Sequence, residues 1–204
     1  MAVNLITSNY RSSFRFLHQR LNLIAITSVA FIGAMLLTLF LLQNIGGVKE
    51  ILASYMADIM AQISPDDTAH DLFLFIFTNN LRAMTTMIAM GVLPFVFMPI
   101  ISIVVNGSMI SFVALISWEK GLNIAAFLGY ILPHGIIEIP LLILSCALGF
   151  YLCLSLTKKI ISEVSIKEAL INIFRTYVLI ILPGILVAAL IEAYITPYIG
   201  SLFM

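Results

Sequence analysis

The sequence predicts an all-α membrane protein, a polytopic helix bundle with about five transmembrane helices and one interfacial amphipathic helix. Of its 204 residues, 62% are hydrophobic and only 10% are charged, whereas a soluble globular domain carries roughly 25% charged residues. The mean hydropathy is +1.13. Apolar runs of about 20 residues, long enough to cross the hydrocarbon core of a bilayer, recur along the chain. We therefore expect a single bundle over residues 21–199, surrounded by membrane lipid.

The chain begins with a basic segment that is followed by an apolar run. Residues 1–20 predict a cytoplasmic basic tail, which carries Arg11, Arg15, His18 and Arg20. Residues 21–42 form an apolar run that is longer than the apolar region of a signal peptide, and no small-residue cleavage site follows it. We expect this run to remain in the membrane as the first transmembrane helix.

Residues 43–71 are polar by comparison and predict an extracytoplasmic amphipathic segment. Apolar residues recur there at helical spacing, while charged residues such as Glu50 and Asp58 occupy the opposite face. This pattern fits a helix that lies in the membrane interface. A helix packed on the outer face of the bundle would show the same pattern, so both interpretations stay open.

The apolar run over residues 72–118 is about twice as long as one span. Pro94 and Pro99 lie near its middle, and proline cannot continue a regular helix without losing a hydrogen bond. The run therefore divides into two expected helices, at residues 72–93 and 97–118.

Two further apolar segments complete the expected bundle. Residues 125–156 are somewhat long for a single span, and Pro133 predicts a break or kink near that position. Residues 157–175 are rich in charge and predict a cytoplasmic loop. The last span is expected at residues 176–199.

The distribution of positive charge predicts the topology. Seven of the ten Lys and Arg lie in residues 1–20 and 157–175. Five spans place both segments on one side of the membrane, and the positive-inside rule makes that side cytoplasmic. The sequence thus predicts a multi-pass protein of the cytoplasmic (inner) membrane, with the N-terminus inside and the C-terminus outside. Zero net charge argues against a nucleic-acid partner, which requires a basic surface.

Four ionisable residues fall inside the expected spans, where each costs roughly 2.5 kcal/mol or more unless it is paired or hydrated. Their distances along the helices, at about 1.5 Å per residue, place all four in the outer half or the middle of the bilayer. His134 and Glu138 share one helix face. We expect a polar intramembrane cluster in which Arg82 lies between two carboxylates and three amides complete the network, formed by Asn79, Asn80, Arg82, Asn106, His134, Glu138 and Glu192.

Three interpretations of this cluster stay open. It could hold the helices in register by hydrogen bonds. It could line the path of a substrate, an ion or a proton. It could also be catalytic, because His134, Glu138 and Glu192 could bind a divalent metal that activates water. The His-Glu-x-x-His pair of common zinc proteases is not found in the sequence.

The same residues lie in a series of motifs that resembles a known family. The series comprises Phe77-Thr78-Asn79-Asn80-Leu81-Arg82, Asn106-Gly107, Leu132-Pro133-His134-Gly135-Ile136-Ile137-Glu138-Ile139-Pro140 and Ala189-Leu190-Ile191-Glu192-Ala193-Tyr194-Ile195-Thr196-Pro197. In this order they resemble the stage II sporulation protein M family of small bacterial and archaeal membrane proteins.

The resemblance implies a polytopic protein of the cytoplasmic membrane but does not imply one activity. The sporulation member of the family acts with partners in cell-wall remodelling. Other members occur beside ABC-transporter ATPases or in gene clusters for circular bacteriocins, where they are linked to maturation, secretion or self-immunity.

The sequence therefore leads to one principal functional hypothesis and two alternatives. The principal one is a membrane subunit for transport, secretion or assembly of a peptide or small amphiphile. It would work with a separate protein partner such as an ATPase, and it could form homo-oligomers. The first alternative is an intramembrane metal-dependent peptidase or peptide cyclase that uses His134, Glu138 and Glu192. The second is a non-catalytic scaffold in sporulation or cell-wall remodelling.

Overall fold

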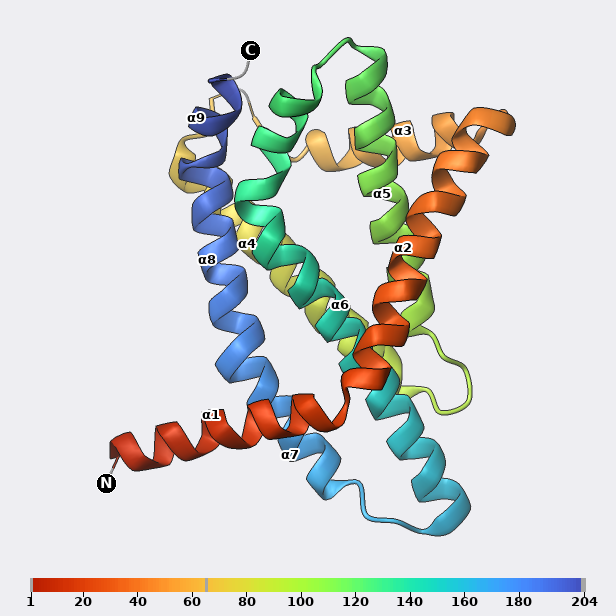
Figure 1. The fold of residues 1–204 in the computed structure, drawn as a ribbon, viewed down its shortest axis with the longest axis vertical. Coiled ribbons are helices and arrows are strands. Elements are labelled where there is room, and N and C mark those ends of the chain that lie inside the picture. The colour runs from red at the N-terminus through yellow and green to blue at the C-terminus, as the bar shows by residue number, and fades with distance from the viewer. Residues whose placement is uncertain (1, 65, 203–204) are drawn as a thin grey trace.

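The computed structural model describes residues 2–64 and 66–202, and over these residues the protein consists of helices without any strand (Figure 1). Five helices are long and apolar enough to cross a membrane, which confirms the predicted all-α transmembrane bundle. They are α2 (Leu21–Asn44), α4 (Ala69–Ala89) with the 3-10 turn Met90–Val92, α5 (Pro99–Glu119), α6 (Ile124–Ser162), and a continuous run of α7 (Lys167–Thr176), a π-helical turn (Tyr177–Ile181) and α8 (Leu182–Tyr194).

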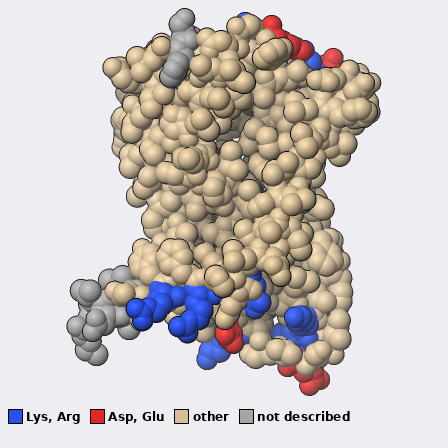
Figure 2. Space-filling model, in the orientation of Figure 1, with Lys and Arg blue, Asp and Glu red and all other residues tan. Residues whose placement is uncertain are grey.

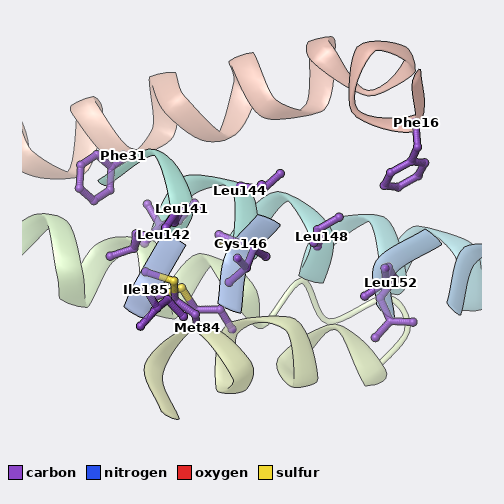
Figure 3. Packing of buried hydrophobic residues seen from close by; sticks show 14 residues of the cluster. Phe16, Phe31, Met84, Leu141, Leu142, Leu144, Cys146, Leu148, Leu152 and Ile185 are labelled. Atoms are coloured by element: carbon purple, nitrogen blue, oxygen red, sulfur yellow. The ribbon is translucent and has the colours of Figure 1, made fainter. Parts of the chain in front are cut away.

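Helix α6 forms the centre of the bundle. It crosses the molecule obliquely, with α2 and α5 packed together on one side and α4 and α8 packed together on the other (Figure 1). The middle of α6 is the most deeply buried part of the chain, and it includes Cys146 and Leu148. Side chains from neighbouring helices pack around it, among them Phe31, Met84 and Ile185 (Figure 3).

Helices α4 and α6 approach each other backbone to backbone. A Cβ atom built on Gly91, in the 3-10 turn after α4, would lie 2.0 Å from the carbonyl oxygen of Gly149 on α6. A Cβ atom on Gly149 would lie 2.4 Å from the carbonyl oxygen of Met87. Small residues are what allows such an approach between transmembrane helices. This contact fixes the height of α4 relative to α6, and with it the heights of the polar residues that each helix carries.

Two segments expected to be irregular are largely helical. The basic tail forms α1 (Ala2–Gln19), which lies across one end of the bundle and packs against α7 (Figure 1). Phe16 anchors it, because this ring is buried and meets the Tyr151 ring edge-on at 5.2 Å. The expected loop at residues 157–175 contains the end of α6 and all of α7, so only a short turn remains.

Of the break or kink expected near Pro133, the break is not present, because α6 runs as one helix of 39 residues through both Pro133 and Pro140. The Asn123 side chain caps its start by accepting a hydrogen bond from the backbone N–H of Ala126 at 2.7 Å. A proline removes only one helical hydrogen bond. An irregular segment in hydrocarbon would leave several backbone groups without partners, so the membrane favours a continuous helix.

Except for Arg82, Glu138 and Glu192, the charged side chains gather at the two ends of the bundle. We call the end with α1, α7 and the turn between α6 and α7 the basic end, and Figure 2 shows Lys and Arg along it with an uncharged belt above. The opposite end carries α3 (Val48–Met60), which packs against α5 through an ion pair between Lys49 and Glu119. Both basic segments thus lie at the same end, whereas the side of the membrane that this end faces stays a prediction.

Candidate functional site

Helix α6 places an imidazole and a carboxylate one turn apart on the same face. Residues four apart in a regular helix lie above one another, and because α6 is unbroken at Pro133, this spacing holds for His134 and Glu138. Both side chains are half-buried. They lie well inside a membrane-spanning helix, at a level where water is scarce.

The chain returns to the same place with Glu192 at the end of α8. One possible ligand atom from each of His134, Glu138 and Glu192 lies within 4.8 Å of the other two. We call these three residues the His/Glu/Glu group. α8 ends at Tyr194 and the short helix α9 (Thr196–Ser201) follows, so that the hydroxyl of Thr196 lies 3.3 Å from Nδ1 of His134. This hydrogen bond orients the imidazole ring.

Arg82 does not join this group, contrary to the arrangement expected from the sequence. Its side chain is exposed on α4, and it lines neither of the cavities that the His/Glu/Glu group lines. Among the residues that the structure describes, the one ion pair is that between Lys49 and Glu119 at the opposite end from α1. The rotation of α4 about its own axis explains this. Met84 and Met87 face the core, so Arg82, on the opposite side of the helix, points outward.

Two cavities meet at the His/Glu/Glu group. The first, of about 460 Å³, lies between α3, α4, α6 and the α8–α9 corner, and we call it the α4 cavity. The second, of about 340 Å³, lies between α5, α6 and α8, and we call it the α5 cavity. All three residues of the group line both cavities. The group therefore lies where the two cavities adjoin.

The three asparagines predicted for the cluster divide between these cavities. Asn79 and Asn80 line the α4 cavity, on the helix that faces α6 and α8. Asn106 lines the α5 cavity, and its amide nitrogen donates to the carbonyl oxygen of Ser102 at 2.8 Å. The amides thus surround the two cavities and do not form one compact network with the His/Glu/Glu group.

Sequence reasoning missed two polar residues of the site. Thr196 was absorbed into the last expected span, although its position four residues after Glu192 is a signal that it returns to the same face. Tyr130 lies one turn before His134 and lines the α4 cavity. A Cβ atom on Gly200 would lie 2.2 Å from the Tyr130 ring, so α9 packs directly on α6 there. Both contacts depend on the end of α8 near Ile195, which hydropathy does not reveal.

The charges of the site require a cation or protons. Two carboxylates this close repel each other when both are ionised, and a low-dielectric environment strengthens that repulsion. Arg82 does not offset it. One imidazole and two carboxylates are donors that divalent zinc or manganese accepts, and the adjoining cavities leave room for water or substrate at further coordination positions.

Comparison with known proteins identifies a family for this chain. The family model for stage II sporulation protein M matches residues 23–197, a range that contains the whole His/Glu/Glu group. An uncharacterized protein of Methanocaldococcus jannaschii is 32% identical over 133 residues, which make up 63% of this chain and 73% of that protein. No solved structure matches.

The family match covers most of the chain and includes every predicted site residue from Asn79 to Glu192. The five apolar helices agree with a multi-pass membrane protein. The chain therefore belongs to the stage II sporulation protein M family.

Proposed function

We propose that the protein is a membrane subunit for transport, secretion or assembly of a peptide or small amphiphile, and that the His/Glu/Glu group controls passage between the α4 and α5 cavities. The observation that supports this is the position of the group, since its three side chains line both cavities. A carboxylate pair at such a position changes its repulsion when it gains or loses a proton or a cation. That change would alter how closely α6 and α8 pack.

The walls of the two cavities suit an amphiphilic ligand. Apolar side chains such as Ile59 and Phe75 line the α4 cavity together with asparagine amides, and Met109 and Val113 line the α5 cavity. The sequence contains no phosphate-binding loop, so energy for export would come from a separate ATPase. Circular-bacteriocin maturation, export or immunity is one setting in which such a subunit would act.

Substitution of the carboxylates tests this function. Glu138→Gln and Glu192→Gln keep the size of each side chain but remove its charge. In cells that lack the native protein, we expect each variant to reduce export or resistance by about tenfold or more, because ionisable residues inside a membrane bundle commonly serve its function. Export of the candidate peptide is measured beside protein levels in the membrane. The matched control is Glu119→Gln at the bundle end, which should retain activity. Full activity of both cavity variants at normal levels would refute the proposal.

A second candidate is an intramembrane metal-dependent peptidase or peptide cyclase, which the 4.8 Å grouping of three ligand atoms favours. His134, Glu138 and Glu192 would hold the ion, which would supply a Lewis acid and an activated water. Thr196 would keep the imidazole oriented through its hydroxyl.

Metal analysis of purified protein tests this second candidate. We expect close to one zinc or manganese ion per chain, with at least a tenfold reduction in His134→Ala, because three ligands are needed to retain the ion. His70→Ala is the control, since this histidine lies in the first turn of α4 outside the group. A metal-free preparation with full activity would exclude the metal-dependent mechanism and leave the transport proposal standing.

A further inference from the structure

Helix α4 exposes polar side chains, whereas a helix in contact with lipid is expected to expose apolar ones. Its buried face is apolar and carries Ile76, Met84 and Met87. The other side of the helix lies opposite Met84 and Met87, and at its edges Asn79 lines the α4 cavity and Thr85 lies beside Tyr177. Its exposed polar residues form what we call the α4 polar face, beside the apolar Leu74, which is 44% exposed: Asp71, Thr78, Asn79, Arg82, Thr85 and Thr86.

Helix α2 shows what a lipid-facing surface looks like in this protein. Its exposed side chains are apolar, and they include Val29 at 70%, Ile32 at 54% and Leu36 at 62% exposure. Hydrocarbon accepts such side chains without penalty but not a guanidinium group. The α4 polar face therefore differs in kind from the surface that α2 turns to lipid.

Part of this face is satisfied within the protein. The hydroxyl of Thr78 donates to the carbonyl oxygen of Leu74, and that of Thr85 to the carbonyl oxygen of Leu81, each at 2.7 Å. The Thr85 oxygen also lies 2.6 Å from the hydroxyl of Tyr177 in the π-helical turn, so the bundle already occupies this end of the face. Hydroxyl groups in transmembrane helices commonly bond in this way. In the part of the chain that the structure describes, Asn79 and Arg82 have no hydrogen-bond or ion-pair partner. The unsatisfied groups thus lie at one level, near the middle of the helix.

Contact with lipid headgroups does not explain why unsatisfied polar groups lie at this depth. Arg82 precedes Val92, at the basic-end terminus of the span, by about ten residues, or roughly 15 Å along the helix. An arginine side chain reaches partway along this distance, but the rest of the face, at Asn79 and Thr78, lies still deeper from that end. A phosphate at the membrane surface would still leave the Asn79 amide without a partner, whereas the Thr78 hydroxyl is already bonded within α4.

A second copy of the chain does not explain it either. A two-fold axis along the membrane normal would place Arg82 against the Arg82 of the other copy. Among the described residues inside the spans away from the helix ends, the carboxylates are Glu138 and Glu192, which are half-buried beside each other. No exposed carboxylate of this chain is therefore available at the depth of Arg82.

We propose that the α4 polar face docks a transmembrane helix of a partner protein that carries an aspartate or glutamate at the depth of Arg82. The carboxylate would pair with the guanidinium group, and a polar side chain one turn away would bond the Asn79 amide. Thr78 and Thr86, exposed on either side of Arg82, would permit close approach of the two helices. Asn79 also lines the α4 cavity, so the docked helix would lie beside that cavity. The inference does not depend on the proposed transport or metal chemistry.

Model peptides in vesicles test the proposal. The protein carries a dye at Ser64→Cys, near the start of α4, and leucine-rich transmembrane peptides with a central Glu or a central Gln carry the second dye. In phosphatidylcholine vesicles, we expect the Glu peptide to associate about tenfold more strongly than the Gln peptide, as measured by energy transfer. Arg82→Leu should abolish this preference, and Arg82→Lys should retain part of it. Arg15→Leu at the basic end is the matched control and should leave the preference intact.

Each other occupant of the face gives a distinct result. Equal association of the two peptides would overturn the proposal, as would an unchanged preference in Arg82→Leu. Energy transfer between differently dyed copies of the protein, lost in Arg82→Leu, would assign the face to a homodimer instead. Competition by phosphatidylglycerol that removes the Glu peptide would assign it to an anionic lipid. Thermal unfolding of Arg82→Leu in the same vesicles should match wild type, since Arg82 makes no contact that this substitution would break.

Discussion

At the scale of single residues, the sequence identified the His/Glu/Glu group but misplaced Arg82. His134, Glu138 and Glu192 are recognisable because an ionisable side chain in an apolar run is costly and rarely faces lipid. Their spacing along the chain gives their depth, since each residue rises by about 1.5 Å. Depth alone does not give rotation about the helix axis. The packing of Met84 and Met87 decides that rotation for α4, and it turns Arg82 away from the carboxylates.

The contact between α4 and α6 gives a prediction at single residues. In Gly149→Ala, the new methyl group would lie 2.4 Å from the carbonyl oxygen of Met87, and neither backbone can move without shifting its helix. We expect a loss of about 1 to 3 kcal/mol in the free energy of unfolding, as for other overpacked cores. Unfolding in mixed micelles of detergent and denaturant measures it.

The control for this substitution is Gly33→Ala on α2, where a Cβ atom meets nothing within 4 Å. Its stability should equal that of wild type or rise slightly, because alanine has the higher helix propensity. Equal stability of the two alanine variants would show that the backbones of α4 and α6 are not in contact at Gly149.

At the scale of elements, hydropathy predicts where the spans lie but not how they end. Each apolar run became a helix, because a chain in hydrocarbon must satisfy its backbone internally. The same demand carried α6 through Pro133, where proline rules derived from soluble proteins predict an interruption. Helix α1 does not stand out by hydropathy because polar residues alternate with its apolar ones, so that it contains no continuous apolar run. It is held by tertiary contacts such as that of Phe16 with Tyr151.

The pairing of α2 with α5 yields a prediction at this scale. A buried hydrogen bond of 2.7 Å joins the hydroxyls of Thr38 and Ser108, and beside it the Ser111 hydroxyl donates to the carbonyl oxygen of Met35. In a double-mutant cycle, Thr38→Val and Ser108→Ala should couple by about 0.6 kcal/mol and by no more than about 1.7 kcal/mol, as interhelical bonds in membranes do. Unfolding free energies of the four proteins measure the coupling.

Thr27→Val provides the comparison for that cycle. The Thr27 hydroxyl donates to the carbonyl oxygen of Leu23 within α2, so this substitution removes a bond of similar length that joins no second helix. Combined with Ser108→Ala, its effect should be additive. Additivity in the Thr38 cycle as well would mean that the bond between the two helices contributes no stability.

At the scale of the whole molecule, the two basic segments lie at the same end of the bundle, as five spans require. The four crossings between residues 1–20 and 157–175 bring both segments to the same end, and α1 does pack against α7 there. On the face that Figure 2 shows, an uncharged belt separates this end from the end with α3, whereas Arg82 is exposed on α4 between the two ends. The arrangement in depth could therefore be predicted from the sequence. The two cavities could not, because they depend on the angles at which α5 and α8 cross α6.

The orientation of the molecule in the membrane gives the last prediction. Since basic loops stay in the cytoplasm, a membrane-impermeant maleimide should label Ser64→Cys in intact spheroplasts but should reach Ser162→Cys only after permeabilisation. Both positions are exposed; Ser64 lies between α3 and α4, and Ser162 is the last residue of α6 at the basic end. The wild-type protein serves as the blank, because Cys146 and Cys153 are both 0% exposed. The reverse labelling pattern would place the basic end outside. Labelling of both variants in intact spheroplasts would mean that the two positions do not lie on opposite sides of the membrane.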